Sequence, residues 1–371
     1  MKIIYFTRDY SPHDARFLAA LAESPHQVKL MRLEGSKGGK RVLPEGIKEI
    51  EWAGGHHAAR WSDYPSLRRD FKRVILEHKP DLIHAGPIQR VAVLPASCGF
   101  HPLVTMSWGS DLLHDAERSL FQNWIARYVL SRTSVLVGDC QAVAEKARQL
   151  GFPVERIVLF PWGVDLNHFT PGKAVSLRRK LGWEKDLILL SNRSWEPIYG
   201  VDLVIRAFAR IKGLIPQARL LLLGDGSQND DIRGMITRFG LKDRVHLAGR
   251  IDLKTLPEYY RAADLFLSAS HSDGSSVSLM EAMACGKPAI VSDIPGNQEW
   301  IHENENGWLF PDGREDVLAE KLILAANEMK NRDRFGAKNR IIAEKRANWK
   351  ENFKKLLDAY DLAVNAFRGS A

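Results

Sequence analysis

The chain has 371 residues, a formal net charge of +8 and a composition of 45% hydrophobic and 26% charged residues. That length exceeds what one hydrophobic core normally organises, so we expect two domains. The balance of apolar and charged residues excludes wholesale disorder. The three cysteines, Cys98, Cys140 and Cys285, lie far apart in the sequence, which excludes a disulfide framework and a cysteine zinc site.

Hydropathy and charge narrow the expected location and partners. The sequence contains no apolar run long enough to cross a bilayer, and its start does not resemble a signal peptide, so we expect a cytoplasmic protein. The positive charge is divided evenly between the two halves of the chain, which predicts no nucleic-acid partner. The basic residues at 338–355 are expected to form a solvated helix face; the alternative is a peripheral contact with the inner face of a membrane.

The first part of the chain alternates short apolar runs with segments of helical period. This pattern is typical of parallel strands that are covered on both faces by helices. We expect strands at residues 2–6, 27–33, 80–85, 102–107, 134–138 and 156–160. We expect helices at residues 14–23, 63–78, 114–132 and 140–150.

The same pattern restarts after residues 163–172, where Gly and Pro give the chain a crossing point between two cores. Strands are expected at residues 186–191, 218–224, 244–248, 264–268 and 288–292, with helices at 201–214 and 276–285. We therefore predict two doubly wound α/β domains, residues 1–166 and 167–349, that face each other across a cleft. A final helix over about 350–371, with an apolar stripe, is expected to pack back on the first domain.

The strongest local motif lies in residues 270–288, where a polar loop follows a predicted strand and leads into an apolar helix. The unpaired N–H groups and the positive dipole end of a helix start suit a phosphate-sized anion. Gly274 permits a close approach of the backbone, and Ser275 or Ser276 can cap the helix.

Two carboxylates accompany this loop. Glu281 falls on the second turn of the predicted helix and leans back toward the loop, where it could accept hydrogen bonds from two hydroxyls, as a ribose offers. Asp273 lies in the loop, so the pair could hold two parts of one extended ligand. The alternative is that Asp273 only starts the helix and that Glu281 is a solvated or salt-bridged carboxylate.

The block from Asp273 through Glu281 to Asn306 and Gly307 resembles the signature of glycosyltransferase family 4, a family of retaining nucleotide-sugar enzymes with the two-domain GT-B fold. Further segments similar to that family are residues 160–169, 193–208, 222–226 and 245–249. The resemblance is specific over residues 160–310 and loose in the first half.

The resemblance implies that the second domain binds the sugar donor. Glu281 would hold the ribose, Asp273 the transferred sugar, and Arg193 with the amides of residues 274–277 the diphosphate. A guanidinium just after a strand suits phosphate oxygens. The implied donor site comprises Arg193, Tyr199, Gly224, Arg250, Asp273, Gly274, Ser275, Ser276, Val277 and Glu281.

The sequence departs from the family pattern at four places. Asp273 stands where the family usually has Glu, and Tyr199 where it usually has Lys, so one diphosphate cation is missing unless Arg250 supplies it. Residues 8–16 replace the glycine-rich loop of the acceptor side, and residues 107–111 replace a segment that often contains His.

The implied reaction is the transfer of a sugar from a UDP- or GDP-sugar to a hydroxyl acceptor: a sugar, a glycolipid or a small molecule. It proceeds with retention and without a metal or other cofactor; Asp230 and Asp231 are expected to start a helix rather than to bind a metal. His13 and Asp111 join Asp273 and Arg193 as candidate catalytic residues, because both follow predicted strands.

These residues also have structural alternatives. His13 could start a helix, and Asp111 could cap the next one. His84 could serve the site or be a buried, hydrogen-bonded imidazole, and Trp108 and Trp195 are candidates to line the cleft.

Two other functions remain open on the same fold. The chain could be a non-catalytic nucleotide- or sugar-binding regulator, in which Asp273 and Tyr199 mark lost catalysis, or a sugar-phosphate epimerase or phosphorylase. Fold analogy does not name the donor base, the sugar, the acceptor or the oligomeric state.

Overall fold

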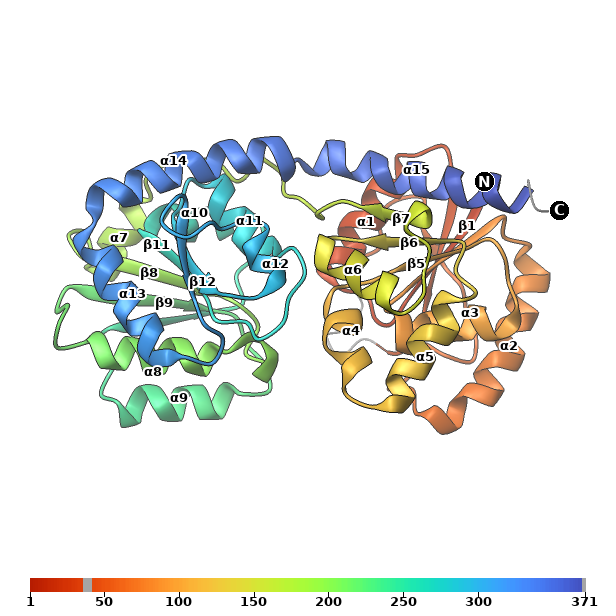
Figure 1. Ribbon diagram of the computed structural model, residues 1–371, viewed down its shortest axis with the longest axis horizontal. Helices are drawn as coiled ribbons and strands as arrows, with labels where there is room; N and C mark the ends of the chain where they lie inside the picture. Colours follow the sequence, from red (N-terminus) through yellow and green to blue (C-terminus); the bar gives the residue numbers. More distant parts are fainter. Residues whose placement is uncertain (36–41, 369–371) are drawn as a thin grey trace. The chain divides into compact units, whose positions relative to one another are not determined.

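The computed structural model describes residues 1–35 and 42–368. The chain forms two compact units, one of Met1–Phe160 with Phe353–Ala371 and one of Pro161–Asn352. Each unit contains one parallel sheet with helices on both faces (Figure 1). The predicted cleft concerns the placement of the units relative to each other, and it stays a prediction.

The first unit is built on a seven-stranded sheet in the order β3-β2-β1-β4-β5-β6-β7. Its strands are β1 (Lys2–Thr7), β2 (Gln27–Arg32), β3 (Lys48–Glu49), β4 (Leu82–Gly86), β5 (Leu103–Met106), β6 (Val135–Gly138) and β7 (Ile157–Leu159). Its helices are α1 (Pro12–Ala22), α2 (Tyr64–His78), α3 (Val93–Cys98), α4 (Ser110–Leu113), α5 (Leu120–Leu130), α6 (Gln141–Gln149) and most of α15 (Trp349–Arg368).

The six strands predicted for this unit are present, but β3 and the short helix α4 were not predicted, and the helices differ from the prediction in two further places. The helix predicted over residues 114–132 begins only at Leu120, because the Ser119 side chain caps it by accepting from the amide of Gln122. The sequence analysis also missed α3, which follows a π-helical turn at Ile88–Ala92. The segment is short and mostly buried, and a short apolar run of this kind does not by itself distinguish a helix from a strand.

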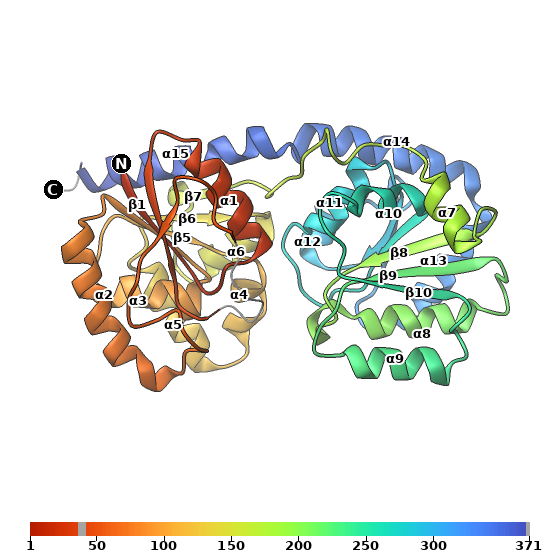
Figure 2. The ribbon, with the colours of Figure 1, turned by 180° about the vertical axis from the view of Figure 1, so that it is seen from behind.

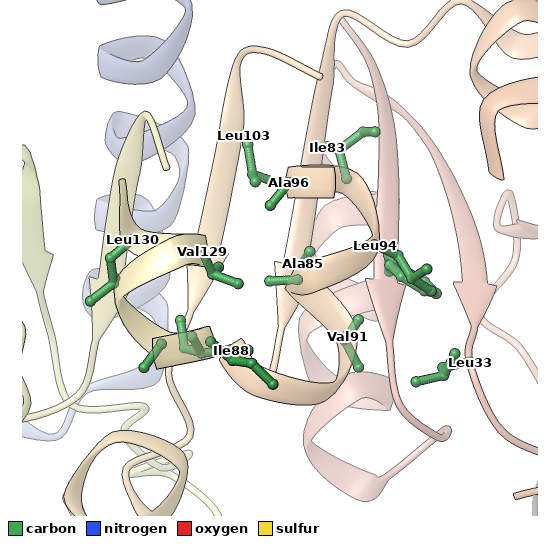
Figure 3. Close-up of a cluster of buried hydrophobic side chains, with 14 of the residues drawn as sticks. Leu33, Ile83, Ala85, Ile88, Val91, Leu94, Ala96, Leu103, Val129 and Leu130 are labelled. Atoms are coloured by element: carbon green, nitrogen blue, oxygen red, sulfur yellow. The ribbon is translucent and has the colours of Figure 1, made fainter. Parts of the chain in front are cut away.

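One face of the first sheet packs on α2, α3 and α5. Figure 3 shows Ile83 and Ala85 of β4 together with Leu94 of α3 and Val129 of α5 in one cluster of buried side chains. Alternate residues of a strand point to opposite faces, so His84 lies on the other side, under α15. Because helices pack on both faces of the sheet, both sets of alternate residues in its strands are apolar, and each strand is a continuous apolar run in the sequence.

On that other face, His84 is a buried, hydrogen-bonded imidazole, the structural alternative for this residue. Its Nδ1 lies 2.6 Å from the hydroxyl oxygen of Tyr360 on α15, and its ring centroid lies 4.6 Å from that of Tyr5. Burial lowers the pKa of His84 to about 3, so the ring is neutral at physiological pH. This contact joins the C-terminal helix to the centre of the first sheet.

The second unit contains a six-stranded sheet in the order β10-β9-β8-β11-β12-β13. Its strands are β8 (Leu187–Asn192), β9 (Ala218–Leu223), β10 (Val245–Gly249), β11 (Leu265–Ser268), β12 (Ala289–Ser292) and β13 (Gly307–Phe310). Its helices are α7 (Val175–Leu181), α8 (Val201–Ile211), α9 (Asn229–Arg238), α10 (Leu256–Ala262), α11 (Val277–Ala284), α12 (Pro295–Gln298), α13 (Glu315–Asn327) and α14 (Met329–Arg346).

Helices cover both faces of this sheet as well. Figure 2 shows α8 and α9 on one face and α10 and α11 on the other, and separate apolar clusters lie beneath the two layers. The strand β13 was not predicted. Asp230 and Asp231 lie in the first turn of α9, as the sequence analysis expected. Trp195 was wrongly placed at the cleft: it is 1% exposed, and its indole N–H donates to the carbonyl of Leu223 at 3.1 Å.

The basic residues at 338–355 do not form one solvated face. The Arg340 guanidinium donates to the carbonyls of Phe169 and Ala284, both at 2.8 Å, and Arg346 lies over the ring of Trp300. Two of these cations therefore stabilise the second unit internally. Among the described residues, no helix has both the length and the apolar character that crossing a membrane requires.

A tight turn at Gly200 starts α8 and brings the chain against the end of β11. Gly200 has φ +58°, and a Cβ atom built there would lie 2.1 Å from the carbonyl oxygen of Ala269. Both the left-handed backbone and the absence of space require glycine at this position.

We expect Gly200→Ala to lower the free energy of unfolding by at least about 2 kcal/mol, because it adds backbone strain to a steric clash. Urea denaturation measures the change. Gly213→Ala is the matched control, since a Cβ atom there meets nothing within 4 Å, and we expect a change within about 0.5 kcal/mol. Equal stability of the two variants would contradict this account of the turn.

Candidate functional site

The candidate site lies at the carboxyl ends of two neighbouring strands of the second sheet. Arg193 directly follows β8, and the loop with Asp273 connects β11 to α11. Because β8 and β11 are adjacent and parallel, their following segments meet at the same edge. The structure thus brings Arg193 and Asp273 together.

The Arg193 guanidinium is held by four side chains. Its Nη2 lies 2.7 Å from Oδ2 of Asp273, and its Nη1 donates to the hydroxyls of Ser276 at 2.7 Å and Ser278 at 3.0 Å. The ring of Tyr199 lies beneath it, with the central guanidinium carbon 4.2 Å from the ring centroid. These contacts fix a planar cation that is only 10% exposed at the start of α11.

Burial dominates the electrostatics of Asp273. It raises the pKa of this carboxyl, although Arg193, Ser276 and the amide of Gly274 favour the charged form. The Gly274 amide donates to Oδ1 of Asp273 at 3.1 Å. Asp273 therefore combines a cation partner with a raised affinity for a proton.

Glu281 lies farther along α11 and is buried. Its Oε2 accepts a hydrogen bond of 2.7 Å from the hydroxyl of Tyr260 on α10, and that hydroxyl accepts from the side-chain amide of Asn192 at 3.0 Å. Burial and the charge of Glu281 raise the pKa of Tyr260, which keeps the hydroxyl protonated as a donor. This chain of contacts orients the Glu281 carboxylate.

The loop before α11 is shaped by close packing. Ser276, rather than Ser275, caps the helix, and the Ser275 hydroxyl accepts instead from the indole of Trp300 at 3.1 Å. A Cβ atom at Gly296 would lie 2.4 Å from the Gly274 carbonyl oxygen, so α12 approaches the loop backbone directly. Val277 is the first residue of the helix. The loop is thus held in one conformation by its neighbours.

Gly224 and Arg250 lie on the other side of Arg193. Gly224 has φ +105°, and a Cβ atom there would lie 2.5 Å from the Arg193 carbonyl oxygen, which makes Gly224 the support of the Arg193 backbone. Arg250 is exposed. The pKa of Asp225 is lowered by hydrogen bonds from Asn229 and Gly226 and, to a smaller extent, by the charge of Arg250. The structure thus associates Arg250 with Asp225.

Of the candidate residues in the first unit, His13 lies in the first turn of α1, beside Trp108. It is the second residue of α1, half-buried, and its ring centroid lies 5.7 Å from that of Trp108, which follows β5. Ser11 caps this helix through the amide of Asp14. His13 and Trp108 therefore lie side by side at the carboxyl edge of the first sheet.

Contrary to its structural alternative, Asp111 does not cap a helix, because it lies inside α4, which has no side-chain cap. This residue is 3% exposed, and its carboxylate accepts from the amide of Ile88 at 2.9 Å, the Ser107 hydroxyl at 2.6 Å and the amide of Trp108 at 3.0 Å. Burial raises its pKa despite these bonds. Through these hydrogen bonds Asp111 fixes the loop that carries Trp108 and so positions that side chain.

Sequence analysis missed Tyr260 and Asn192. Tyr260 belongs to a pair of tyrosines in α10, and no spacing rule indicates which of them reaches Glu281. Asn192 ends β8 beside the identified Arg193, and that position was the available signal. In the part of the chain that the structure describes, no group of three or more His, Cys, Asp or Glu side chains is arranged to hold a metal ion.

Comparison with known families gives a match for each of the two parts of the chain. Residues 175–354 match the family described as "Glycosyl transferases group 1", and residues 13–163 match the "Glycosyl transferase 4-like domain". The fold and the site define a two-sheet α/β protein of the GT-B class. Within that class, the chain belongs to the glycosyltransferases of the GT4 type.

Solved structures support the fold. Alr3699/HepE of Anabaena, in complex with UDP-glucose, has a TM-score of 0.80 at 21% identity, over 97% of this chain and 99% of that one. Sucrose-phosphate synthase from Thermosynechococcus elongatus has a TM-score of 0.81 at 20% identity, over 99% of this chain and 100% of that one.

A curated relative is the D-inositol 3-phosphate glycosyltransferase of Xylanimonas cellulosilytica, 30% identical over 254 residues. That match covers 64% of this chain and 58% of the relative. The chain therefore spans little more than half of the length of that relative.

Replacing Tyr260 with Phe removes the hydroxyl that orients Glu281. We expect Tyr260→Phe to lower the free energy of unfolding by about 1–3 kcal/mol, because the buried Glu281 carboxylate and the half-buried Asn192 amide both lose this partner. Tyr259→Phe, at a half-buried position of the same helix, should change it by less than about 0.5 kcal/mol. Urea denaturation compares the two, and equal losses would show that the hydrogen bond contributes nothing specific.

Proposed function

We propose that this chain is a retaining, metal-independent glycosyltransferase that moves a sugar from a UDP- or GDP-sugar to a hydroxyl acceptor. The observation that carries the proposal is the placement of Arg193 beside Asp273 at the start of α11, with Glu281 on the same helix. Family membership and the fold support it.

The donor would bind in the second unit, which corresponds to the domain predicted over residues 167–349. Arg193 and the amides at the start of α11 would hold the diphosphate, and the oriented Glu281 carboxylate would accept from the two ribose hydroxyls. Asp273 would contact the transferred sugar. Because Arg193 is largely buried, its charge is weakly screened where negative charge develops on the departing diphosphate.

The proposed chemistry needs no protein nucleophile. The acceptor hydroxyl attacks the anomeric carbon on the face from which the diphosphate departs, and its proton passes to a phosphate oxygen of the leaving group. The protein then binds, orients and stabilises. We assign acceptor contacts to the first unit, which corresponds to the domain predicted over residues 1–166. His13, beside Trp108, is the first residue to examine.

One observation favours a second candidate, a nucleotide- or sugar-binding regulator. Arg193 has an internal counter-ion in Asp273, and the neutral Tyr199 ring lies where a second cation would strengthen diphosphate binding. A regulator would bind nucleotide without hydrolysing or transferring the sugar. A screen of nucleotide sugars for hydrolysis and transfer, with Arg193→Ala as the inactive control, separates the two functions.

We expect UDP or GDP to raise the melting temperature of the chain, because a ligand that binds only the folded state adds about 2.7 kcal/mol at a hundred times its Kd. Glu281→Ala should abolish the shift, whereas Glu258→Ala, on an exposed position of α10, should retain it. Thermal denaturation with each nucleoside diphosphate provides the measurement. If no nucleotide shifts the transition of the unmodified chain, the proposal fails.

The affinity for UDP should rise as the pH falls through the raised pKa of Asp273. Bound diphosphate adds negative charge beside this carboxyl and raises its pKa further, so binding takes up a proton. The groups that act on the carboxyl are Arg193, Ser276 and the Gly274 amide. Its charge also acts on the nearby Tyr199.

Calorimetric titration of UDP at several pH values tests this linkage against Asp273→Asn. The nucleotide's own titration is common to both proteins and cancels in the comparison. The variant should bind UDP more tightly at neutral pH and lose this part of the pH dependence. Identical pH profiles for the two proteins would show that Asp273 does not compete for Arg193.

A further inference from the structure

The start of α5 exposes three large apolar side chains. Leu120 is 92% exposed, Phe121 53% and Trp124 59%. The opposite side of α5 packs into the core, where Val129 and Leu130 contact the other buried residues of the first unit (Figure 3). The helix therefore has an apolar face in the core and a second one in solvent.

Three half-buried aromatic rings, which also pack against the core, adjoin this exposed surface. Trp61 has its ring centroid 5.5 Å from that of Phe121 and stacks on Tyr64 at 4.5 Å, and Trp124 stacks on Tyr128 at 5.5 Å. We call this group the α5 aromatic patch; it consists of Trp61, Tyr64, Leu120, Phe121, Trp124 and Tyr128. Clustering of this kind on a surface indicates a binding partner more often than scattered apolar residues do.

The charge around the patch is positive. Arg118, Arg127 and Arg132 accompany it, and the sequence from residue 118 to residue 138 contains no Asp or Glu. Arg132 lies over the ring of Tyr128, with its guanidinium carbon 4.1 Å from the centroid. Arginines beside tryptophan and tyrosine suit a surface that is apolar below and anionic above.

The carboxylates that precede the patch along the chain are partnered. Asp115 lies 3.1 Å from His114 and 3.8 Å from Arg118, and Glu117 pairs with Lys146. Asp63, next to the Trp61 turn, accepts from the amide of Arg60 at 2.8 Å. These three carboxylates are outnumbered by the cations beside them, Arg60, Arg118, Arg127, Arg132 and Lys146, so the net charge around the patch is positive.

We propose that the α5 aromatic patch docks on the surface of an anionic lipid bilayer, with Leu120, Phe121 and Trp124 inserted at the level of the headgroups. A bilayer interface accepts exposed apolar side chains without the matching pocket that a protein partner would have to provide. Phosphate headgroups supply the negative charge that Arg118 and Arg132 complement. Arg127 adds to the positive charge of the surface, while its guanidinium donates to the Leu150 carbonyl.

A second copy of this chain fits the patch less well. A symmetric contact would place the same surface on both sides, so the three arginines of each copy would face those of the other without a carboxylate between residues 118 and 138. The basic residues at 338–355 are also a weaker candidate for the membrane, since Arg340 and Arg346 are engaged within the second unit.

Flotation of the full chain with lipid vesicles tests the proposal. We expect binding to vesicles of phosphatidylcholine and phosphatidylglycerol, weaker binding to phosphatidylcholine alone, and a further loss as salt is raised. Replacing both Phe121 and Trp124 with Ser should lower the partition coefficient at least about tenfold. Leu214→Ser, which removes a 69% exposed side chain from the second unit, is the matched control and should leave binding unchanged.

The charge component has its own variant. Arg118→Gln combined with Arg132→Gln should reduce the preference for phosphatidylglycerol while some binding to neutral vesicles remains. Leu120→Ser is a second apolar variant in case the double serine variant does not fold, because Leu120 is almost fully exposed and its removal cannot disturb the core. Thermal denaturation verifies the fold of each variant.

Three results would overturn the proposal. The unmodified chain could fail to bind anionic vesicles, or both apolar variants could bind as strongly as the unmodified chain. Alternatively, sedimentation without lipid could show a dimer that Leu120→Ser dissociates, which would assign the patch to a second copy.

Discussion

Arg193 follows β8, and Asp273 lies in the loop after the adjacent strand β11. Their ion pair joins the end of β8 to this loop, which leads into α11. A charge that is largely removed from water is tolerated only when counter-charge and hydrogen bonds compensate for the lost hydration. Here the compensation comes from Asp273, Ser276, Ser278 and the ring of Tyr199. The position of α11, and with it that of Glu281, depends on this arrangement.

The same pair determines how the site would receive an anion. In the described structure the guanidinium is already neutralised, so an incoming phosphate has to share the cation with Asp273 or displace it. Net attraction at long range is consequently small, and binding depends on short-range hydrogen bonds and on the helix start. A site built in this way would distinguish one anion from another by the geometry of its hydrogen bonds more than by the charge of the anion.

The sequence predicted the parts of the fold that depend on local patterns. Buried strands such as β1 and β8 are apolar runs of the right length, and the loop before α11 is marked by its composition. Long-range contacts were not readable. Trp195 was expected in a cleft and lies in the core, and Asp111 serves backbone amides, because both outcomes depend on which distant elements pack nearby.

The candidate site was predicted to a similar extent. The residues on the motif, Asp273 and Glu281, do lie with Arg193 at one sheet edge, but the hydrogen bond from Tyr260 that orients Glu281 joins two helices across the fold. Ser278 was not predicted as a site residue, although its hydroxyl accepts a hydrogen bond from Arg193. Spacing in sequence identifies which groups share an edge, whereas their partners depend on tertiary packing.

The path of the chain has a consequence for how the protein is made. The chain leaves the first unit after Phe160 and returns to it at Phe353. The two crossing segments are paired where Val164 donates to the Ala347 carbonyl and accepts from the Trp349 amide. Tyr360, which covers His84, is therefore synthesised after the whole of the second unit. During synthesis the second unit can complete its core before the first, so the half that is translated earlier finishes folding later.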